Sequence, residues 1–236
     1  MGILDTHTHI LPCMDDGARS PERSLQMLQL EIEQGVDTVV LSPHFYADRE
    51  APERFFERRM NAIRLLEKQL TALPNTPRLL VGAEVAYFDG LSRTEALEGL
   101  CIGTTGAMLV EMPFCPWTER MLADLFEVRS QRGIQPIVAH VERYLSFQDR
   151  DIVSRLCDEG CWIQTNASFF SRWQTARKAI AMLRREEIHF IGSDCHDMHQ
   201  RKPNISEAAA KITRKLGPEG MDFLLEMKET LLGGAR

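Results

Sequence analysis

Short apolar runs alternate with helical segments along the whole of this chain, and this alternation limits the folds available to it. The runs are rich in valine, isoleucine and leucine, as expected for strands that are buried on both faces of a sheet. Seven strands are predicted, at residues 3–10, 36–44, 79–85, 107–112, 135–141, 161–166 and 189–194. The alternation is typical of a parallel α/β architecture, and seven strands predict a barrel one unit short of the eight-stranded form.

Helices are predicted between these strands from apolar periodicity and capping signals. Ser20-Pro21 marks the start of the first helix, and Gly35 suits its end. Further helices are expected from Pro52 onward and at residues 118–133, 149–159, 171–185, 206–216 and 219–232. The 236-residue chain has no repeat and no linker-like change of composition, so a single barrel domain over residues 1–236 is expected.

Six of the seven predicted strands end in histidine or a carboxylate residue. In a parallel α/β barrel, active-site residues lie at the C-terminal ends of the strands. The residues at or just beyond these ends are His7, His9, His44, Glu84, Glu111, His140, Asp194 and His196. Because they come from different parts of the chain, a shared site is favoured over chance scatter. The sixth strand is the exception and ends in Asn166.

His7 and His9 carry the strongest local signal. Residues i and i+2 of a strand point to the same face, so both imidazoles can bind one metal ion. Asp15 and Asp16 follow in a glycine-containing loop that can fold back over the same place. Two unrelated surface histidines are the alternative interpretation of this pair.

Several imidazoles and carboxylates without an obvious thiolate suit a divalent ion such as Mn, Fe or Zn. The number of candidate ligands exceeds what one tetrahedral zinc needs, which favours a cluster of two or three metals. Such a cluster would lower the pKa of a bound water and hold a phosphate ester for in-line attack.

Charge and hydropathy exclude other classes of function. The chain has 28 Lys and Arg against 34 Asp and Glu residues, a formal net charge of −6, so neither nucleic acid nor an anionic membrane is an expected partner. No apolar run approaches the roughly 20 residues of a membrane span, and no signal-peptide pattern is present. The six cysteines form no C-x-x-C pair. A cytoplasmic protein without membrane insertion is expected, and its oligomeric state is left open.

Five dispersed motifs carry a family resemblance: D-T-H-T-H (5–9), S-P-H (42–44), G-A-E (82–84), A-H (139–140) and S-D-C-H (193–196). Together they resemble the polymerase and histidinol phosphatase (PHP) family. Three further segments, H-I-L-P-x-x-D-D-G-A (9–18), H-V-E-R-Y (140–144) and S-D-x-H followed by Arg201, are more specific. They resemble the metal-dependent protein-tyrosine phosphatases of bacterial capsule and exopolysaccharide biosynthesis, and the match covers essentially the whole chain.

The resemblance implies a distorted, TIM-like (β/α)7 barrel of PHP type with three divalent metal ions, often manganese. It implies that one ion is held by His7, His9, Glu84 and Asp194, a second by Glu84, Glu111 and His140, and a third by Asp16, His44 and His196. Arg143 and Arg201 match family arginines that bind the substrate phosphate in catalysis. Tyr46, Phe114 and Trp117 are expected at the substrate entrance, with simple packing as the alternative.

The sequence departs from the family pattern at two positions. Phe45 stands where some members have a second histidine, and His199 is an additional histidine. Because of the first departure, we expect the loop at residues 45–50 to differ in its substrate contacts rather than in metal binding. Asp5 is expected to orient a ligand histidine, and Asp15 to bond to backbone.

The expected function is hydrolysis of phosphotyrosine by a metal-bound hydroxide. The resemblance implies that the substrate is the tyrosine-rich tail of a bacterial autokinase that controls polysaccharide export. A small-molecule phosphatase of the same family, for example on histidinol phosphate, is the nearer alternative. A non-catalytic binding module is the alternative from another class. The C-x5-R pattern at residues 13–19, typical of cysteine-dependent phosphatases, is attributed to chance because its two aspartates would repel a phosphate.

Overall fold

The computed structural model describes residues 2–234 of the chain. The strands are β1 (Ile3–Thr8), β2 (Val36–Leu41), β3 (His44–Phe45), β4 (Arg78–Val81), β5 (Glu84–Ala86), β6 (Ala107–Glu111), β7 (Gln135–Val138), β8 (Trp162–Asn166) and β9 (Phe190–Gly192). The α-helices are α1 (Pro21–Glu33), α2 (Pro52–Leu70), α3 (Glu119–Arg132), α4 (Ile152–Asp158), α5 (Ala167–Ser171), α6 (Ala176–Leu183), α7 (Ile205–Leu216) and α8 (Asp222–Gly233). Short 3-10 helices are η1 (Leu91–Arg93), η2 (Leu97–Leu100), η3 (Val141–Arg143) and η4 (Pro218–Met221).

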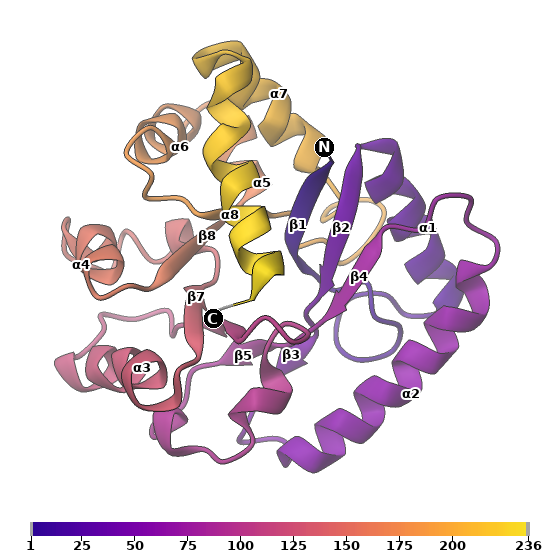
Figure 1. Ribbon diagram of the computed structural model, residues 1–236, viewed down its shortest axis with the longest axis horizontal. Helices are drawn as coiled ribbons and strands as arrows, with labels where there is room; N and C mark the ends of the chain where they lie inside the picture. The colour runs from indigo at the N-terminus through magenta and orange to yellow at the C-terminus, as the bar shows by residue number, and fades with distance from the viewer. Residues whose placement is uncertain (1, 235–236) are drawn as a thin grey trace.

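The strands form two parallel sheets, with the orders β1-β2-β4 and β3-β5-β6-β7-β8-β9. The two sheets curl together, and the helices lie mainly around the outside (Figure 1). A backbone bridge between Thr8 and Cys195 links β1 to the segment that follows β9. The expected parallel α/β architecture is therefore confirmed as a curled, barrel-like sheet.

Two predicted strands are divided in the structure, because those predicted at 36–44 and 79–85 each form two short strands. The helix predicted at 171–185 begins later, as α6 at Ala176, and the short helix α5 before it was not predicted. The backbone of Arg172 is extended (φ −70°, ψ 131°) and ends α5. Phe170 before this point is buried, whereas Trp173 after it is 82% exposed, so the apolar face of one helix does not continue into the other.

The breaks in β2 and β4 lie side by side. Pro43 lies in the first break, where a proline has no N–H to donate to a neighbouring strand. The N–H of Gly82 donates to Leu41 O (2.9 Å), and that of Glu84 donates to Pro43 O (3.0 Å), which keeps the two segments aligned. Beyond the breaks, His44 and Glu84 are register partners in β3 and β5. The interruption thus brings two candidate ligands together.

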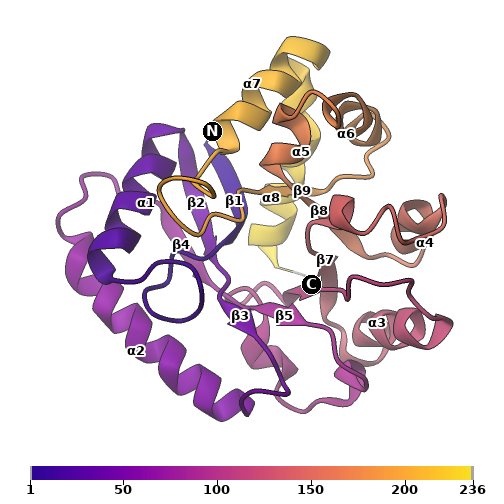
Figure 2. The ribbon, with the colours of Figure 1, turned by 180° about the vertical axis from the view of Figure 1, so that it is seen from behind.

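The N-terminal end of the curled sheet is filled by apolar side chains and closed by α8. The cluster there includes Leu4, Val40, Leu80, Leu109, Ile137, Phe190, Met227 and Leu231. The buried Lys228 of α8 donates from Nζ to Gly2 O (2.8 Å) and to Asp37 Oδ1 (2.5 Å), next to the starts of β1 and β2. Helix α8 lies in front in Figure 1, and the loops after β1 and before α7 come to the front in Figure 2.

Ionisable side chains replace apolar ones toward the other end of the sheet. Because side chains alternate along a strand, residues two apart share a face. Leu109 of β6 belongs to the inner apolar cluster, so Glu111 of the same strand also faces inward. The C-terminal ends of the strands are therefore where the polar site lies.

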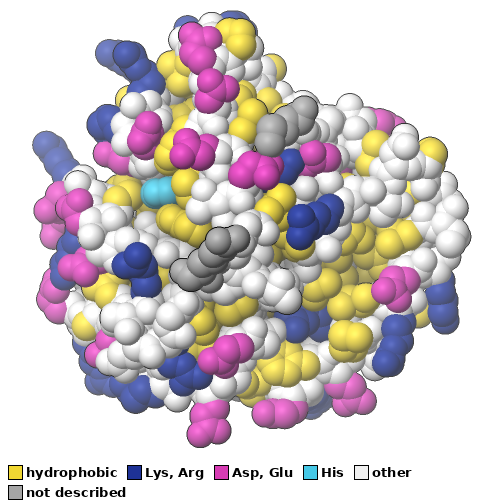
Figure 3. All heavy atoms as spheres, in the orientation of Figure 1, with side chains coloured by type: hydrophobic (Ala, Val, Ile, Leu, Met, Phe, Trp, Pro, Cys, Tyr) yellow, Lys and Arg dark blue, Asp and Glu magenta, His cyan; other side chains and the backbone are white. Residues whose placement is uncertain are grey.

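The surface shown in Figure 3 carries charges of both signs. Lysine and arginine side chains are interspersed with aspartate and glutamate, so this face has no continuous basic surface of the kind that binds nucleic acid. Among residues 2–234, no helix combines the length and the apolarity that a membrane span requires.

Asp124 of α3 fixes η1 to the outside of the sheet. Its carboxylate accepts hydrogen bonds from the backbone N–H groups of Gly90 (2.9 Å), Leu91 (3.0 Å) and Ser92 (3.1 Å). The hydroxyls of Ser92 (2.5 Å) and Tyr87 (3.2 Å) also donate to it. Burial would raise the pKa of Asp124, but these hydrogen bonds outweigh it and hold the pKa below its usual value.

We expect Asp124→Ala to lower the free energy of unfolding by about 3 kcal/mol, because several buried donors lose a charged acceptor. The lowered pKa means that this stabilisation is present above the unfolded-state pKa and is lost as pH falls through the folded-state pKa. Urea unfolding at several acidic pH values measures both effects. Asp158→Ala on the exposed side of α4 is the control, with an expected change within about 0.5 kcal/mol. Equal losses in the two variants would contradict this account.

Candidate metal centre

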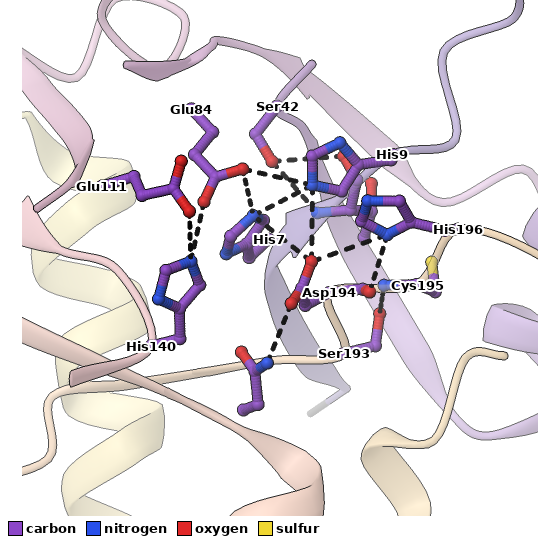
Figure 4. A network of polar contacts seen from close by, with 12 residues as sticks. His7, His9, Ser42, Glu84, Glu111, His140, Ser193, Asp194, Cys195 and His196 are labelled. Carbon is purple, nitrogen blue, oxygen red and sulfur yellow. Dashed lines mark hydrogen bonds and ion pairs between the residues drawn. The ribbon is translucent and has the colours of Figure 1, made fainter. Parts of the chain in front are cut away.

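Two imidazoles lie side by side at the end of β1. His7 and His9 are both fully buried, and their Nε2 atoms are 3.1 Å apart (Figure 4). The hydroxyl of Thr8, between them, donates to Val40 O of β2 (2.7 Å), which anchors this segment to the sheet. The expectation that the two histidines project to one face is confirmed.

The nine side chains predicted as ligands come together at this end of the sheet. Their possible donor atoms form overlapping groups in which all atoms lie within 4.8 Å of one another. The groups are His9–Asp16–His44–His196, His7–Glu84–His140, His7–His9–Asp194 and His44–Glu84–Glu111. Eight of these residues are buried or half-buried, and Asp16 is exposed.

Glu84 lies at the centre of these groups. Its Oε1 is 2.8 Å from His140 Nε2. Its Oε2 is 2.8 Å from His44 Nδ1, 3.1 Å from His7 Nε2 and 3.3 Å from His9 Nε2. Burial would raise the pKa of Glu84, but the positive charge of His7 and the close contacts with His140 and His44 hold it well below its usual value.

Several buried polar atoms at this site lack a well-directed hydrogen bond. They are Glu84 Oε2, His44 Nδ1 and His196 Nε2, whose neighbours within 3.3 Å are other ionisable side chains. Buried polar atoms without partners are unfavourable and rare in folded proteins. Imidazole nitrogens and carboxylate oxygens are ligands of Mn, Fe and Zn, and nine of them exceed the four of a tetrahedral ion. The donor set therefore fits more than one divalent cation.

The carboxylates at the two sides of the site have opposite pKa shifts. Burial and the negative charge of Glu84 raise the pKa of Glu111 to about 7. Burial would also raise the pKa of Asp194, but the positive charge of His7 and a hydrogen bond from His9 hold it well below its usual value. Burial thus disfavours the ionised form of Glu111, which a bound cation would favour.

Strand β8 contributes two amide side chains that the sequence interpretation missed. Gln164 Oε1 accepts from the backbone N–H of His140 (2.7 Å) and lies 3.3 Å from His7 Nδ1. Asn166 Nδ2 donates to Asp194 Oδ2 (2.9 Å). Both residues follow strand periodicity into the site, and this i, i+2 pair of amides is the signal that could have identified them.

The backbone is tightly constrained where the segments meet. A Cβ added to Gly192 would lie 2.5 Å from His7 Cβ and 2.8 Å from Gln164 Nε2, so a side chain is excluded there. His140 (φ 30°) and Asp194 (φ 53°) both have positive φ values, which residues other than glycine rarely adopt. Such strain is concentrated at functional sites, where the surrounding structure maintains it.

Two aspartates hold the histidine segment in place from behind. Asp5 Oδ1 accepts from the backbone N–H groups of His7 (3.1 Å) and Ser193 (2.9 Å), so Asp5 acts on the backbone of the segment rather than on an imidazole. Asp15 bonds to backbone as expected, and its Oδ2 also lies 2.8 Å from His9 Nδ1. The contact to His9 is a role for Asp15 that the sequence did not indicate.

Arg143 and Arg201 converge on Asp194 from two segments. Arg143 Nη2 pairs with Asp194 Oδ2, and Arg201 Nη2 donates to Asp194 Oδ1 (2.7 Å). Arg201 Nη1 is also 3.9 Å from Asp16 Oδ2. Both guanidinium groups are partly exposed, so some of their N–H donors are open to solvent.

The site opens beside a cavity of about 630 Å³ whose lining includes His44 and Tyr46. The rings of these two residues pack together with centroids 5.2 Å apart. Phe114 is half-exposed over His140, and Trp117 packs against the buried Tyr144. Of the three aromatic residues expected at the entrance, Tyr46 lines this cavity.

The two departures from the family pattern lie apart from the donor groups. Phe45 is fully buried and packs against Phe55, with ring centroids 5.1 Å apart. Its side chain therefore belongs to the core, and the expected effect on substrate contacts cannot come from the ring of Phe45 itself. His199 is exposed and lies outside the donor groups described above.

The C-x5-R segment uses its backbone N–H groups internally. The N–H of Cys13 donates to Ala18 O (2.8 Å), and that of Ala18 donates to His9 O (3.0 Å). The N–H of Gly17 donates to Asp15 Oδ1 (2.9 Å). These donors are engaged with the chain itself, unlike the N–H groups of a phosphate-binding loop.

Comparison with known proteins finds similar chains over nearly the full length. The chain is 28% identical over 239 residues to tyrosine-protein phosphatase YwqE of Bacillus subtilis strain 168, covering 98% of this chain and 91% of the relative. It is 27% identical over 226 residues to tyrosine-protein phosphatase CpsB of Streptococcus pneumoniae, covering 91% of each.

Solved structures show the same fold. One from a study of YwqE and CpsB, described there as metal-dependent tyrosine phosphatases, superposes with a TM-score of 0.85 at 24% identity, covering 98% of this chain and 95% of the other. The phosphotriesterase homology protein of Escherichia coli, with phosphate in its active site, gives a TM-score of 0.54 at 13% identity, covering 100% and 99%. The family model described as capsular polysaccharide synthesis, CpsB/CapC, matches residues 3–231, and the chain therefore belongs to this family.

Proposed function

We propose that this protein is a metal-dependent protein-tyrosine phosphatase whose nine clustered donor residues hold three divalent ions. The observation that carries this proposal is the convergence of buried imidazoles and carboxylates around Glu84, beside two arginines. The names of the relatives, tyrosine-protein phosphatases from several bacteria, support the choice of substrate.

The proposed ligand sets are those that the family resemblance implies, and each shares two or more residues with one of the donor groups. His7, His9, Glu84 and Asp194 would hold one ion, Glu84, Glu111 and His140 a second, and Asp16, His44 and His196 a third, with manganese as the first choice and iron or zinc as alternatives. When bound, such ions lower the pKa of a coordinated water and neutralise charge on a phosphate ester.

The residues of the chain itself would bind and orient the substrate. Arg143 and Arg201 each present a planar fork of N–H donors that matches the oxygens of a phosphate. Their contacts with Asp194 hold the two forks in position before substrate arrives. Tyr46 would line the path of the phosphotyrosine ring. The leaving group is a phenolate, and because the pKa of a tyrosine hydroxyl in water is about 10, it needs less help from a general acid than an alkoxide does.

We infer that the curled sheet is a distorted (β/α)7 barrel formed by one domain. The pairs β2/β3 and β4/β5 each follow one path interrupted by two residues, so the nine short strands occupy seven positions. The six cysteines are all free thiols, which supports the proposed location in the cytoplasm.

The proposed protein substrate is the tyrosine-rich tail of a bacterial autokinase. A flexible tail suits an open cavity of about 630 Å³ beside the site. Histidinol phosphate is the competing substrate because the same donor set could hydrolyse it. A non-catalytic module is disfavoured, because a protein that had lost catalysis would be expected to have lost some of the nine metal-binding side chains.

We expect chelated protein to lose turnover of a phosphotyrosine peptide and to regain it with added Mn. His140→Ala should retain about two of three ions and lose most turnover, because one ligand set is broken. Elemental analysis and a phosphate-release assay measure the two effects. His199→Ala, an exposed histidine outside the donor groups, is the matched control. If the protein hydrolyses only histidinol phosphate, the proposed metal site stands and the proposed phosphotyrosine substrate is wrong.

Arg143→Ala and Arg201→Ala should each lower kcat/KM for the peptide by about 100-fold, the effect of removing one donor to a transition-state oxyanion. Metal content measured on the same samples separates loss of phosphate contact from loss of ions. Arg177→Ala on α6 is the control for removal of a positive charge. A change of less than twofold in both variants would contradict the assigned role.

Cys13→Ser should retain most of the phosphatase activity, because Cys13 lies in none of the donor groups and its loop does not offer a free phosphate cradle. Steady-state assays of the metal-loaded enzyme test this. Near-complete loss of turnover would reject the metal mechanism in favour of a thiolate nucleophile.

A further inference from the structure

The cavity beside the metal centre has an outer wall formed by residues outside the proposed metal and phosphate sites. On its inner side lie Asp16, His44 and Tyr46 of the proposed site. Its outer side includes Arg49, from the loop after β3, and Arg54 and Arg58 from the first turns of α2. With about 630 Å³, it is much larger than a phosphate group needs and can hold one or two amino-acid side chains beyond the phosphotyrosine.

The arginines of this wall differ in whether an acidic side chain neutralises their charge. Arg58 pairs with Glu50 and donates to Met14 O (2.6 Å), so its charge is compensated. Arg49 lies over the Tyr46 ring, with Cζ 4.1 Å from the centroid.

Among residues 2–234, neither Arg49 nor Arg54 forms an ion pair or a side-chain hydrogen bond, and both are exposed. Of the acidic residues that line the cavity, Asp15 contacts His9, and Asp16 lies 3.3 Å from His196 Nε2. Two guanidinium groups therefore face the cavity with their charge available.

These cations are separate from those assigned to the phosphate. Arg143 and Arg201 are both paired with Asp194 and do not belong to the cavity lining. A substrate whose phosphate lies at Arg143 and Arg201 would leave Arg49 and Arg54 to face whatever is attached to the phosphotyrosine.

We propose that this cavity is an anion-binding subsite, formed by Arg49 and Arg54, for a negatively charged side chain next to the phosphotyrosine. The inference rests on the proposed function and specifies its substrate as an acidic peptide segment. The shared chemistry is an anionic side chain, which can come from aspartate or glutamate or from a second phosphotyrosine. Histidinol phosphate is disfavoured by the same charges, because its amine is cationic.

The test compares peptides of one length on the metal-loaded enzyme. Each carries one phosphotyrosine flanked by glutamine, by glutamate, by a second phosphotyrosine or by lysine. The wild type is expected to show a kcat/KM about three- to tenfold higher for the glutamate peptide than for the glutamine peptide, as expected for one or two partly exposed ion pairs. The preference should fall as the salt concentration rises. The two anionic peptides distinguish a carboxylate from a second phosphate as the preferred source.

Two variants test whether Arg49 and Arg54 cause the preference for the glutamate peptide. Arg49→Gln with Arg54→Gln should bring the glutamate-to-glutamine ratio close to one, and Arg54→Glu should favour the lysine peptide. Both positions are exposed, so we expect the variants to fold, which circular dichroism checks. Arg64→Gln, an exposed arginine further along α2 and outside the cavity, should keep the wild-type ratio.

The outcomes separate this inference from the function on which it rests. Turnover of all peptides without a charge preference, or a preference that survives in the double variant, overturns the subsite and leaves the phosphatase intact. Absence of turnover on every phosphotyrosine peptide, with metal bound, overturns both. A preference that is lost in the double variant and kept in Arg64→Gln supports the subsite.

Discussion

A carboxylate buried among imidazoles is the constraint on which the rest of this structure depends. Glu84 is 1% exposed and lies within 3.3 Å of the ring nitrogens of His7, His9, His44 and His140. Removing a charge from water costs several kcal/mol unless charged or hydrogen-bonding partners surround it. The partners come from three separate segments, so Glu84 is surrounded by them only when the strands have closed around it.

The two ends of the curled sheet serve different purposes. At the N-terminal end, apolar side chains and α8 form a packed core, and Lys228 ties α8 to the backbone at Gly2. At the other end, the interruption at Pro43 and Gly82 turns the chain so that His44 and Glu84 meet in register. The packed core at the N-terminal end can stabilise the fold against the cost of the buried ionisable side chains and the positive φ angles at the polar end.

Much of the site could be predicted because its signals are local. Strand periodicity predicts that His7 and His9 share a face, and the rule for strand ends gathers ionisable residues from distant segments. Gln164 was not found, because a glutamine inside an apolar strand has no ligand signature and acts through contacts with His7 and His140. The ion pair between Arg143 and Asp194 was also not predicted, because no pattern in the sequence near either residue indicates the other as its partner.

By itself, the sequence determined the parallel α/β architecture and the residue types that line its polar end, since hydrophobic periodicity and side-chain chemistry are properties of short segments. The alignment of the breaks that follow β2 and β4, and the end of α5 at Arg172, were decided only by the tertiary structure. The same is true of the donor atoms that face one another across the site. His7 and Asp194 are far apart along the chain, and their contact depends on the closure of the whole sheet between β1 and β9.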